Sequence, residues 1–127
     1  TSWDKTVALE TGVKTNNSNG NIYLVHPTTI GKFKTTAKAS NTAAFIAENS
    51  LINGYPFLTT TNMPTISTGK GILFGNFKDF YILFWSAIDA VADNITLADQ
   101  GMTRYIFNVY VNAGVVQPKS FAKGWLS

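Results

Sequence analysis

The chain has 127 residues, of which 45% are hydrophobic and 13% are charged, and its formal net charge is +3. A chain of this length can bury a core as a single domain, and the absence of cysteine excludes disulfide bonds and thiolate metal sites. The mild positive charge is too weak to indicate nucleic-acid binding. Average soluble domains are roughly 25% charged, so this surface favours a protein whose faces are shared with neighbours.

The first predicted element is a helix over residues 3–12, on which Trp3, Val7 and Ala8 would share one face. A polar, asparagine-rich stretch over residues 14–20 ends this helix and predicts a loop. Residues 22–25 follow as a short run of β-favouring side chains, which predicts a compact strand.

A second helix is predicted over residues 27–38. Pro27 favours a helix start, because the missing N–H of proline costs nothing at the first helical position. Ile30 and Phe33 then follow at helical spacing. We expect this helix to pack on a sheet through these two side chains.

A β-hairpin is predicted at Asn53-Gly54, because both central positions of its turn need positive φ and this pair tolerates it. A strand over residues 55–60 follows the turn. Pro56 cannot donate to a β-ladder, so the strand either starts there or lies at a sheet edge. A short strand is also expected at residues 43–47.

The stretch from residue 71 to residue 93 is the richest in aromatic side chains and is predicted to form the middle of the sheet. Phe84 or Trp85 is therefore expected to be deeply buried. The stretch is too broken for a membrane span, which needs about twenty apolar residues. The strands predicted within it span residues 72–74, 80–85 and 88–92.

Residues 102–111 alternate between two apolar faces and predict one long strand that is covered on both sides. Residues 120–126 then form a terminal strand or tail. Together these elements predict an α+β fold in which two helices pack on a mixed β-sheet. No internal repeat or hinge is present, so residues 1–127 are expected to form a single domain.

The order of local patterns from residue 22 onward resembles the major capsid proteins of tailed phages, which have the fold named after phage Hong Kong 97. The resemblance spans about the last hundred residues. No single pattern is specific to the family, and the resemblance depends on their common order and spacing. The patterns are Tyr23-Leu24-Val25-His26-Pro27, Asn53-Gly54-Tyr55-Pro56-Phe57 with Asn62-Met63-Pro64, Leu73-Phe74-Gly75-Asn76-Phe77, and Val115-Val116-Gln117-Pro118-Lys119-Ser120-Phe121-Ala122.

The resemblance implies that the chain is the axial domain and the last strands of the peripheral domain of a longer capsid protein. The amino-terminal arm, extended loop and spine helix would lie upstream. It further implies pentamers and hexamers of the full-length protein, a place in the virion capsid, and the bacterial cytoplasm before assembly. One departure is Asn76, where the family often has an acid.

Few residues offer reactive chemistry. His26 is the single histidine, and its place between a strand and a proline favours a capping or packing role over that of a catalytic base. Asp89 and Asp93 would point the same way on a strand. They are interpreted as solvent-facing acids, although a paired-carboxylate hydrolase or a Ca²⁺ site would use similar residues. We therefore expect no catalytic, cofactor-binding or metal-binding residues and no enzyme.

Three further patterns have ordinary structural interpretations. Gly69-Lys70-Gly71 precedes a strand and not a helix, so it predicts a turn and not a phosphate loop. Lysines 32, 34 and 38 are interpreted as the wet face of a helix, with weak contact to packaged DNA as the alternative. Asn16-Asn17-Ser18 and Asn94-Ile95-Thr96 fit the glycosylation pattern, which has no meaning in a bacterial cell.

Two classes of function remain open, and neither involves a membrane. The first is a shell subunit that works by self-association, in a phage or prophage capsid or in an encapsulin-like shell. The second is a small carbohydrate- or protein-binding module that uses exposed aromatic side chains. Aromatic residues gathered on an open concave face would favour the binding module, whereas aromatic residues buried in the sheet would favour the shell subunit.

Overall fold

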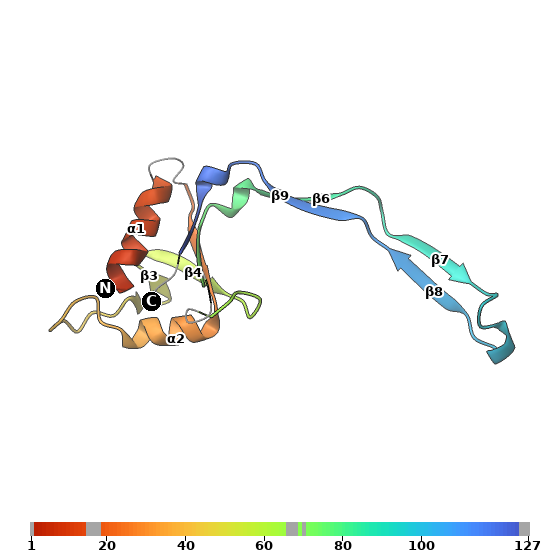
Figure 1. Ribbon diagram of the computed structural model, residues 1–127, viewed down its shortest axis with the longest axis horizontal. Coiled ribbons are helices and arrows are strands. Elements are labelled where there is room, and N and C mark those ends of the chain that lie inside the picture. The colour runs from red at the N-terminus through yellow and green to blue at the C-terminus, as the bar shows by residue number, and fades with distance from the viewer. Residues whose placement is uncertain (1, 15–18, 66–68, 70, 125–127) are drawn as a thin grey trace. The chain divides into compact units, whose positions relative to one another are not determined.

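The computed structural model describes residues 2–14, 19–65, 69 and 71–124. The chain divides into two compact units, and we describe each by itself (Figure 1). The first unit, here called the body, comprises residues 1–79 and 117–127. The second unit, here called the arm, comprises residues 80–116.

The body is built on a six-stranded mixed sheet with the strand order β10-β5-β1-β4-β3-β2. Strand β1 lies near the middle, parallel to β4 and antiparallel to β5, and β5 pairs antiparallel with β10. The bounds are β1 Ile22–Val25, β2 Ala47–Glu48, β3 Leu51–Ile52, β4 Tyr55–Thr59, β5 Ile72–Gly75 and β10 Phe121–Gly124. The predicted strands at 22–25, 55–60 and 72–74 are thereby confirmed.

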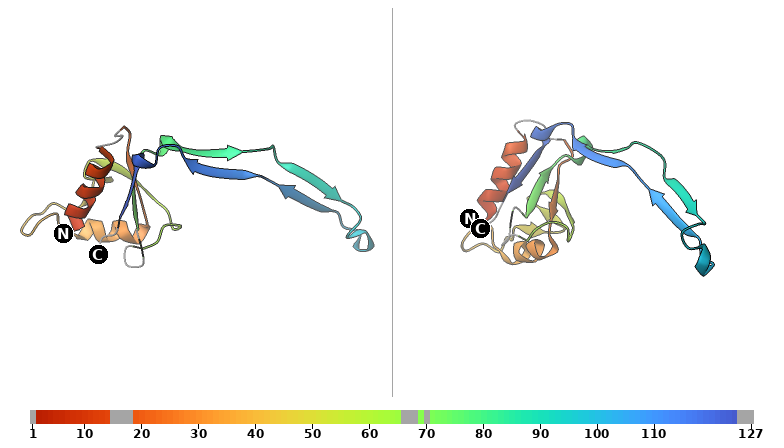
Figure 2. Two further views of the ribbon diagram at one scale, coloured as in Figure 1. Left: turned by 45° about the horizontal axis from the view of Figure 1, so that its top comes forward. Right: turned by 45° about the vertical axis from the view of Figure 1, so that its right-hand side comes forward.

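Two helices complete the body and confirm the predicted α+β class. Helix α1 spans Ser2–Lys14 and packs on β10 and β5, and helix α2 spans Pro27–Thr35 (Figure 2). The expected face of α1 was confirmed only for Trp3, which is partly buried against the core. Val7 is exposed, and the buried residues of the helix are Thr6, Glu10 and Val13. The buried face of α1 includes the polar residues Thr6 and Glu10, so the positions of apolar residues alone did not predict it.

Helix α2 starts as predicted, with Pro27 in the first turn and Ile30 and Phe33 buried. It ends three residues before the predicted end at residue 38. Thr36 already has an extended backbone, and Ala37 forms a β-bridge with Phe45. The chain leaves the helix because this pairing satisfies backbone groups that a longer helix would use.

The core of the body gathers side chains from both helices and the sheet. The rings of Tyr23, Tyr55 and Phe74 pack together, with centroid distances of 4.5 Å between Tyr23 and Phe74 and 5.1 Å between Tyr55 and Phe74. Geometries of this kind add to the stabilisation from apolar burial. The buried hydrophobic residues are Val13, Tyr23, Val25, Ile30, Phe33, Ile46, Ala47, Ile52, Ile72 and Phe74.

The hairpin predicted at Asn53-Gly54 is confirmed, with φ of 49° and 85° at the two residues. It joins β3 to β4, and Pro56 lies at the second position of β4, near the strand start. The strand expected at residues 43–47 is shorter and later than predicted, because β2 begins at Ala47.

The arm consists of two antiparallel two-stranded ribbons (Figure 1). The inner ribbon pairs β6 with β9, and the outer ribbon pairs β7 with β8. The single strand predicted at residues 102–111 was wrong, because the chain breaks into β8 and β9. The bounds are β6 Phe80–Phe84, β7 Asp89–Asp93, β8 Arg104–Asn108 and β9 Val111–Val115.

The two chain segments that flank the arm meet within the body. Each carries a 3₁₀ turn, Phe77–Asp79 in one and Pro118–Ser120 in the other. The buried Ser120 hydroxyl donates to the Asp79 carboxylate at 2.5 Å, and the Asn76 N–H donates to the Ser120 carbonyl at 3.2 Å. These bonds fasten the ends of β5 and β10 together.

Gly75 should tolerate no larger residue at this junction. A Cβ atom there would clash with the Ser120 carbonyl oxygen and lie 2.6 Å from the Phe121 ring. We expect Gly75→Ala to lower the free energy of unfolding by about 1–2 kcal/mol in urea titrations, because one backbone must shift. Gly31→Ala is the matched control: it meets nothing within 4 Å and lies in a helix, so it should be neutral or stabilising. Equal destabilisation by both changes would contradict this account.

Candidate assembly surface

The inner ribbon of the arm has one face made entirely of apolar side chains. Alternate residues of a strand point to opposite faces, and the register places Phe80 opposite Val115, Ile82 opposite Ala113 and Phe84 opposite Val111. We call these six residues the apolar ribbon face. The exposed fractions of Ile82 and Phe84 are 58% and 67%, values far above those of core residues. Contiguous exposed apolar surface of this kind marks an interaction site.

The opposite face of the inner ribbon is mixed. It carries Tyr81 and Leu83, which lie opposite Gly114 and Asn112. The two faces of one short ribbon therefore differ in chemistry while sharing the same backbone. This difference allows a substitution on one face to be matched by a control on the other.

The outer ribbon has a similar division. Ala90 and Ala92 lie opposite the exposed aromatic residues Phe107 and Tyr105 on one face. The other face carries the charged side chains, because Asp89 lies opposite Asn108 and Asp93 opposite Arg104. The two ribbons meet at a break where the Trp85 N–H donates to the Tyr110 carbonyl at 3.1 Å.

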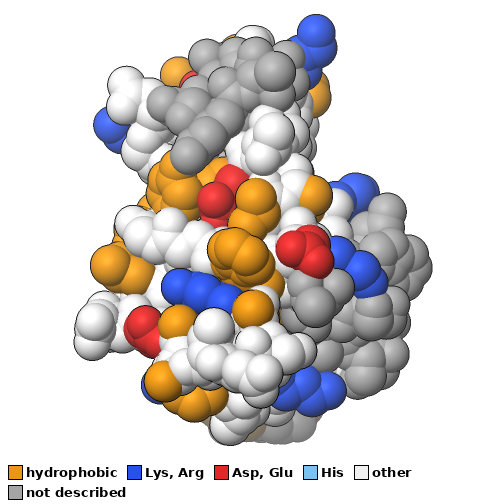
Figure 3. Space-filling view, turned by 90° about the vertical axis from the view of Figure 1, so that its left-hand side faces the viewer, with side chains coloured by type: hydrophobic (Ala, Val, Ile, Leu, Met, Phe, Trp, Pro, Cys, Tyr) orange, Lys and Arg blue, Asp and Glu red, His pale blue; other side chains and the backbone are white. Residues whose placement is uncertain are grey.

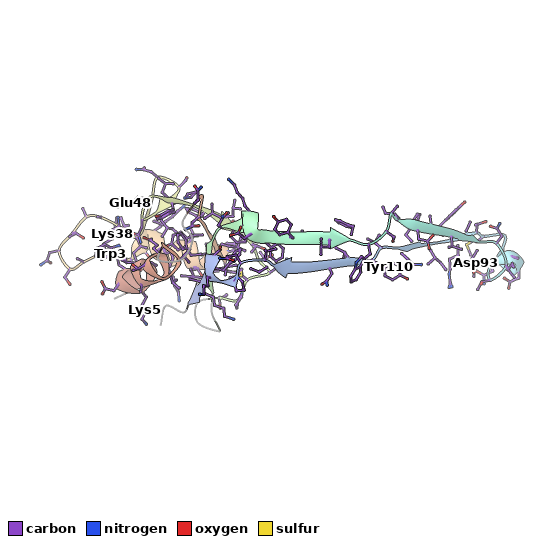
Figure 4. The ribbon with its side chains drawn as sticks, turned by 90° about the horizontal axis from the view of Figure 1, so that it is seen from above. Trp3, Lys5, Lys38, Glu48, Asp93 and Tyr110 are labelled. Atoms are coloured by element: carbon purple, nitrogen blue, oxygen red, sulfur yellow. The ribbon has the colours of Figure 1, made fainter. Side chains whose placement is uncertain are left out.

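The outer end of the arm is a loop ordered by Asp93 (Figure 4). Its carboxylate accepts from the N–H groups of Ile95 at 3.0 Å and Thr96 at 3.1 Å, and from the Thr96 hydroxyl. The Thr96 hydroxyl and these backbone donors hold the pKa of Asp93 below its usual value. Ile95 beside it is 88% exposed. This end of the arm therefore presents an ordered turn with an apolar side chain in solvent.

The expected burial of Phe84 or Trp85 was wrong, since Trp85 is 73% exposed. The stretch from residue 71 to residue 93 does contain β5 of the body sheet, but β6 and β7 belong to the arm. An apolar strand indicates that something covers it and does not say whether the cover lies in the same domain. The sequence therefore indicated correctly that these strands have apolar side chains that favour burial, and wrongly that they lie in the core of the chain.

The body contains a buried polar network that sequence reasoning missed. The Tyr23 hydroxyl donates to Glu10 Oε1 at 2.5 Å, and Asn53 Nδ2 donates to the same oxygen at 2.9 Å. Asn53 also donates to the Thr6 hydroxyl at 3.2 Å and accepts from the Trp3 indole N–H at 3.1 Å. Burial, followed by the bond to Glu10, raises the pKa of Tyr23 well above its usual range. The network joins α1 to β1 and to the β3–β4 turn.

One pocket of the body, of about 180 Å³, lies beside this network. Ligand pockets are typically about 300–1,000 Å³ and rich in aromatic lining. The lining of this pocket contains no aromatic side chain, and Lys38 and Glu48 of the lining are labelled in Figure 4. The lining residues are Lys38, Ile46, Glu48, Asn49, Leu51, Asn53 and Gly54. The pocket is therefore small and poorly suited to a sugar.

His26 occupies the cap position of α2. Its Nδ1 accepts from the Thr28 N–H at 3.2 Å and lies 2.8 Å from the Thr28 hydroxyl. Among the described residues, the His26 ring bonds to Thr28 and to no carboxylate, so these residues do not form a catalytic triad there. The predicted junction role agrees with this geometry.

The remaining predicted features are the lysine side chains and the glycosylation patterns. Lys32 and Lys34 are exposed on α2, whereas Lys38 lies beyond its end and lines the pocket. On the face shown in Figure 3, basic side chains are scattered among acidic and uncharged ones. Lys70 and Asn16-Asn17-Ser18 lie outside the described residues. In the Asn94-Ile95-Thr96 pattern, the threonine hydroxyl is engaged by Asp93.

The described residues contain neither a metal-binding cluster nor a helix suited to cross a membrane. No group of three or more histidine, cysteine, aspartate or glutamate side chains is placed to hold a metal ion in the described part of the chain. Asp89 and Asp93 lie on one face of β7, as predicted, with Asn108 and Arg104 opposite them and no further acid. No helix within the described ranges is long and apolar enough to cross a membrane.

The fold of this chain is similar to that of solved capsid proteins. The structure resembles the capsid of an empty GTA particle computed with C5 symmetry, with a TM-score of 0.77 and 18% identity over 98% of this chain. It also resembles the capsid of a native GTA particle, with a TM-score of 0.72 and 18% identity over 98% of this chain. The chain spans 43% and 44% of the lengths of those proteins. No curated protein matches it.

The model of the phage capsid family matches residues 1–125, which is nearly the entire chain. This match agrees with the resemblance found in the sequence from residue 22 onward and extends it through α1. The chain belongs to the phage capsid family.

Proposed function

We propose that this chain is part of a longer phage or prophage capsid protein and that it works by packing against further copies of that protein. The family match over residues 1–125 is the observation that carries this proposal. Two solved capsid proteins have the same fold and are more than twice as long as this chain. In this proposal the additional length of the whole protein holds the amino-terminal segment, the extended loop and the spine helix expected upstream. That amino-terminal segment is distinct from the arm of residues 80–116.

The exposed arm supports a role in assembly. An isolated two-stranded ribbon is at best marginally stable in water, and stable ribbons gain support from a third strand or a packed layer. The apolar side chains of this arm remain open in the single chain. A subunit that functions within an assembly has such surface available for its neighbours.

No chemical reaction is proposed for this chain. The described residues bring no histidine, carboxylate and hydroxyl together as a triad, and they hold no metal-binding group. The carbohydrate-binding alternative also lacks support, because the pocket beside the polar network has no aromatic lining. The exposed aromatic residues of the arm stand in rows with aliphatic neighbours and not around polar partners.

The proposed assembly is a closed shell of pentamers and hexamers in the virion capsid, formed in the bacterial cytoplasm. Low charge favours it, because like-charged patches would repel when identical surfaces meet. Weak contact between exposed lysines, such as Lys32 and Lys34, and packaged DNA is a further part of this proposal. The scattered basic side chains in Figure 3 allow no more than weak contact on that face.

Expression of the complete reading frame that contains this chain, followed by negative-stain electron microscopy, tests the proposal. We expect closed shells of uniform size. A soluble monomer that binds a sugar or peptide at micromolar affinity would refute the capsid function.

A further inference from the structure

Two Asn-Gly pairs occur in the chain, at Asn19-Gly20 and Asn53-Gly54. Asparagine side chains are chemically labile, and a following glycine leaves its backbone nitrogen unshielded because it has no Cβ atom. That nitrogen can attack the side-chain carbonyl carbon of the asparagine, Cγ. The dipeptide is therefore the sequence context in which spontaneous deamidation proceeds most readily.

The two glycines have similar surroundings. Gly20 has a φ of 71° and Gly54 a φ of 85°, and a Cβ atom at either residue would meet nothing within 4 Å. Both glycines are exposed. The attacking residue therefore does not distinguish the two pairs, and any difference in reactivity must come from the asparagine.

The two asparagine side chains are held very differently. Asn53 is half-buried, and its Nδ2 donates to Glu10 Oε1 at 2.9 Å and to the Thr6 hydroxyl at 3.2 Å. Its Oδ1 accepts from the Trp3 indole N–H at 3.1 Å. Rotation of this amide towards the next backbone nitrogen would break these bonds. Asn19 is exposed, and no hydrogen bond holds its amide within the described part of the chain.

We infer that Asn19 is a site of spontaneous deamidation in the folded chain and that the polar network protects Asn53. The Gly20 nitrogen forms a bond to Asn19 Cγ, and the Cγ–Nδ2 bond breaks. The departing amino group takes up the proton that the Gly20 N–H loses, so ammonia leaves and a cyclic succinimide remains. Water then opens this ring at either carbonyl, which gives aspartate or isoaspartate.

Each conversion at Asn19 changes both the charge and the backbone between α1 and β1. The new carboxylate is ionised at neutral pH, so the formal net charge falls by one, from +3 to +2. Isoaspartate also lengthens the backbone by one methylene group. The same reaction at Asn53 would place a second carboxylate beside Glu10, and the two like charges would repel.

This inference goes beyond the proposed function and does not depend on it. The reaction needs only water, and it is measured on the chain of 127 residues. Shell formation is measured on the longer protein. Either claim can therefore fail without the other.

Peptide mapping by mass spectrometry, after incubation of the folded chain at mildly alkaline pH, measures conversion at each asparagine. We expect at least about tenfold more product at Asn19 than at Asn53, because Asn53 reacts only after local opening breaks a hydrogen bond to a charged group. The rate at Asn19 should rise with pH, since the attacking nitrogen must lose its proton. Labelling with isoaspartyl methyltransferase identifies the isoaspartate product.

Two variants at residue 19 support the assignment. Asn19→Gln keeps the amide but would need a larger and less favoured ring, so conversion at this residue should stop. Asn19→Asp has the charge of the product and marks its position in cation-exchange chromatography. Conversion of Asn19→Gln at the parent rate would contradict attack by the Gly20 nitrogen.

The same incubation in concentrated urea is the control for the polar network. Unfolding removes the contacts of both pairs, so the rates at Asn19 and Asn53 should become similar. A folded chain with no conversion at Asn19, or with equal conversion at both residues, would overturn the inference. A difference between the two residues that persists unchanged in urea would also overturn it, because the flanking sequence and not the network would then set the rates.

Discussion

Replacing Phe74 with alanine is expected to lower the free energy of unfolding of the body by about 3–5 kcal/mol. Phe74 is fully buried and contacts the rings of Tyr23 and Tyr55, so the truncation leaves a cavity in the middle of the sheet. Total stabilities of roughly 5–15 kcal/mol leave little reserve against such a loss. Urea titration followed by circular dichroism measures the change.

Phe84→Ala is the matched control, because it removes the same side chain from a residue that is 67% exposed in the arm. We expect its effect on the unfolding of the body to stay within about 0.5 kcal/mol. The comparison distinguishes the observed core from the one that the aromatic pattern suggested. Equal losses from Phe74→Ala and Phe84→Ala would mean that β6 belongs to the folded core after all.

Replacing Tyr23 with phenylalanine should cost about 1.5–3 kcal/mol at neutral pH. The change removes the hydroxyl that donates to the buried Glu10 carboxylate at 2.5 Å and leaves the ring contacts in place. Hydrogen bonds to charged groups fall in this range of free energy. Tyr81→Phe, at an exposed tyrosine of the arm, is the control and should leave the unfolding of the body unchanged.

The Tyr23→Phe variant also makes a prediction about alkaline pH. Burial raises the pKa of Tyr23 in the folded protein, so the folded state retains its proton while the unfolded state loses it above about pH 10. The stability that Tyr23 contributes is therefore complete below that pH and declines above it, by about 1.4 kcal/mol per pH unit. The difference between the parent and the variant should shrink accordingly. A difference that stays constant up to pH 11.5 would contradict the buried, protonated tyrosine.

Local signals in the sequence predicted most of the body. Pro27 marked the start of α2, and the spacing of Ile30 and Phe33 marked its buried face. Asn53-Gly54 marked the hairpin, because positive φ at two successive positions restricts the residue types. These features depend on residues close together in the chain, and such signals survive in a single sequence.

The polar attachment of α1 could not be predicted in the same way. Thr6 and Glu10 appear as surface residues in a hydrophobicity pattern, yet both are buried against Tyr23 and Asn53. Their burial depends on partners between 13 and 47 residues away in the chain. Hydrophobic periodicity carries no information about such long-range hydrogen bonds.

The exposure of the arm could not be predicted from the sequence, for a different reason. Its strands carry the apolar, β-branched and aromatic residues of a buried sheet, so residues 80–85 were predicted to be core. Composition indicates that these side chains favour burial, but it does not identify the segment or molecule that buries them. The family resemblance identified the family correctly, whereas the aromatic pattern placed the core wrongly.

The solvent exposure of the arm in assembled particles tests the central claim that this chain works by packing against copies of its own protein. An electron cryomicroscopy map of shells formed by the complete reading frame measures it directly. We predict closed shells in which both ribbons of the arm are covered by protein, including a contact from a neighbouring subunit. Shells in which residues 80–116 project freely into solvent, or a complete protein that forms no shells, would contradict the account.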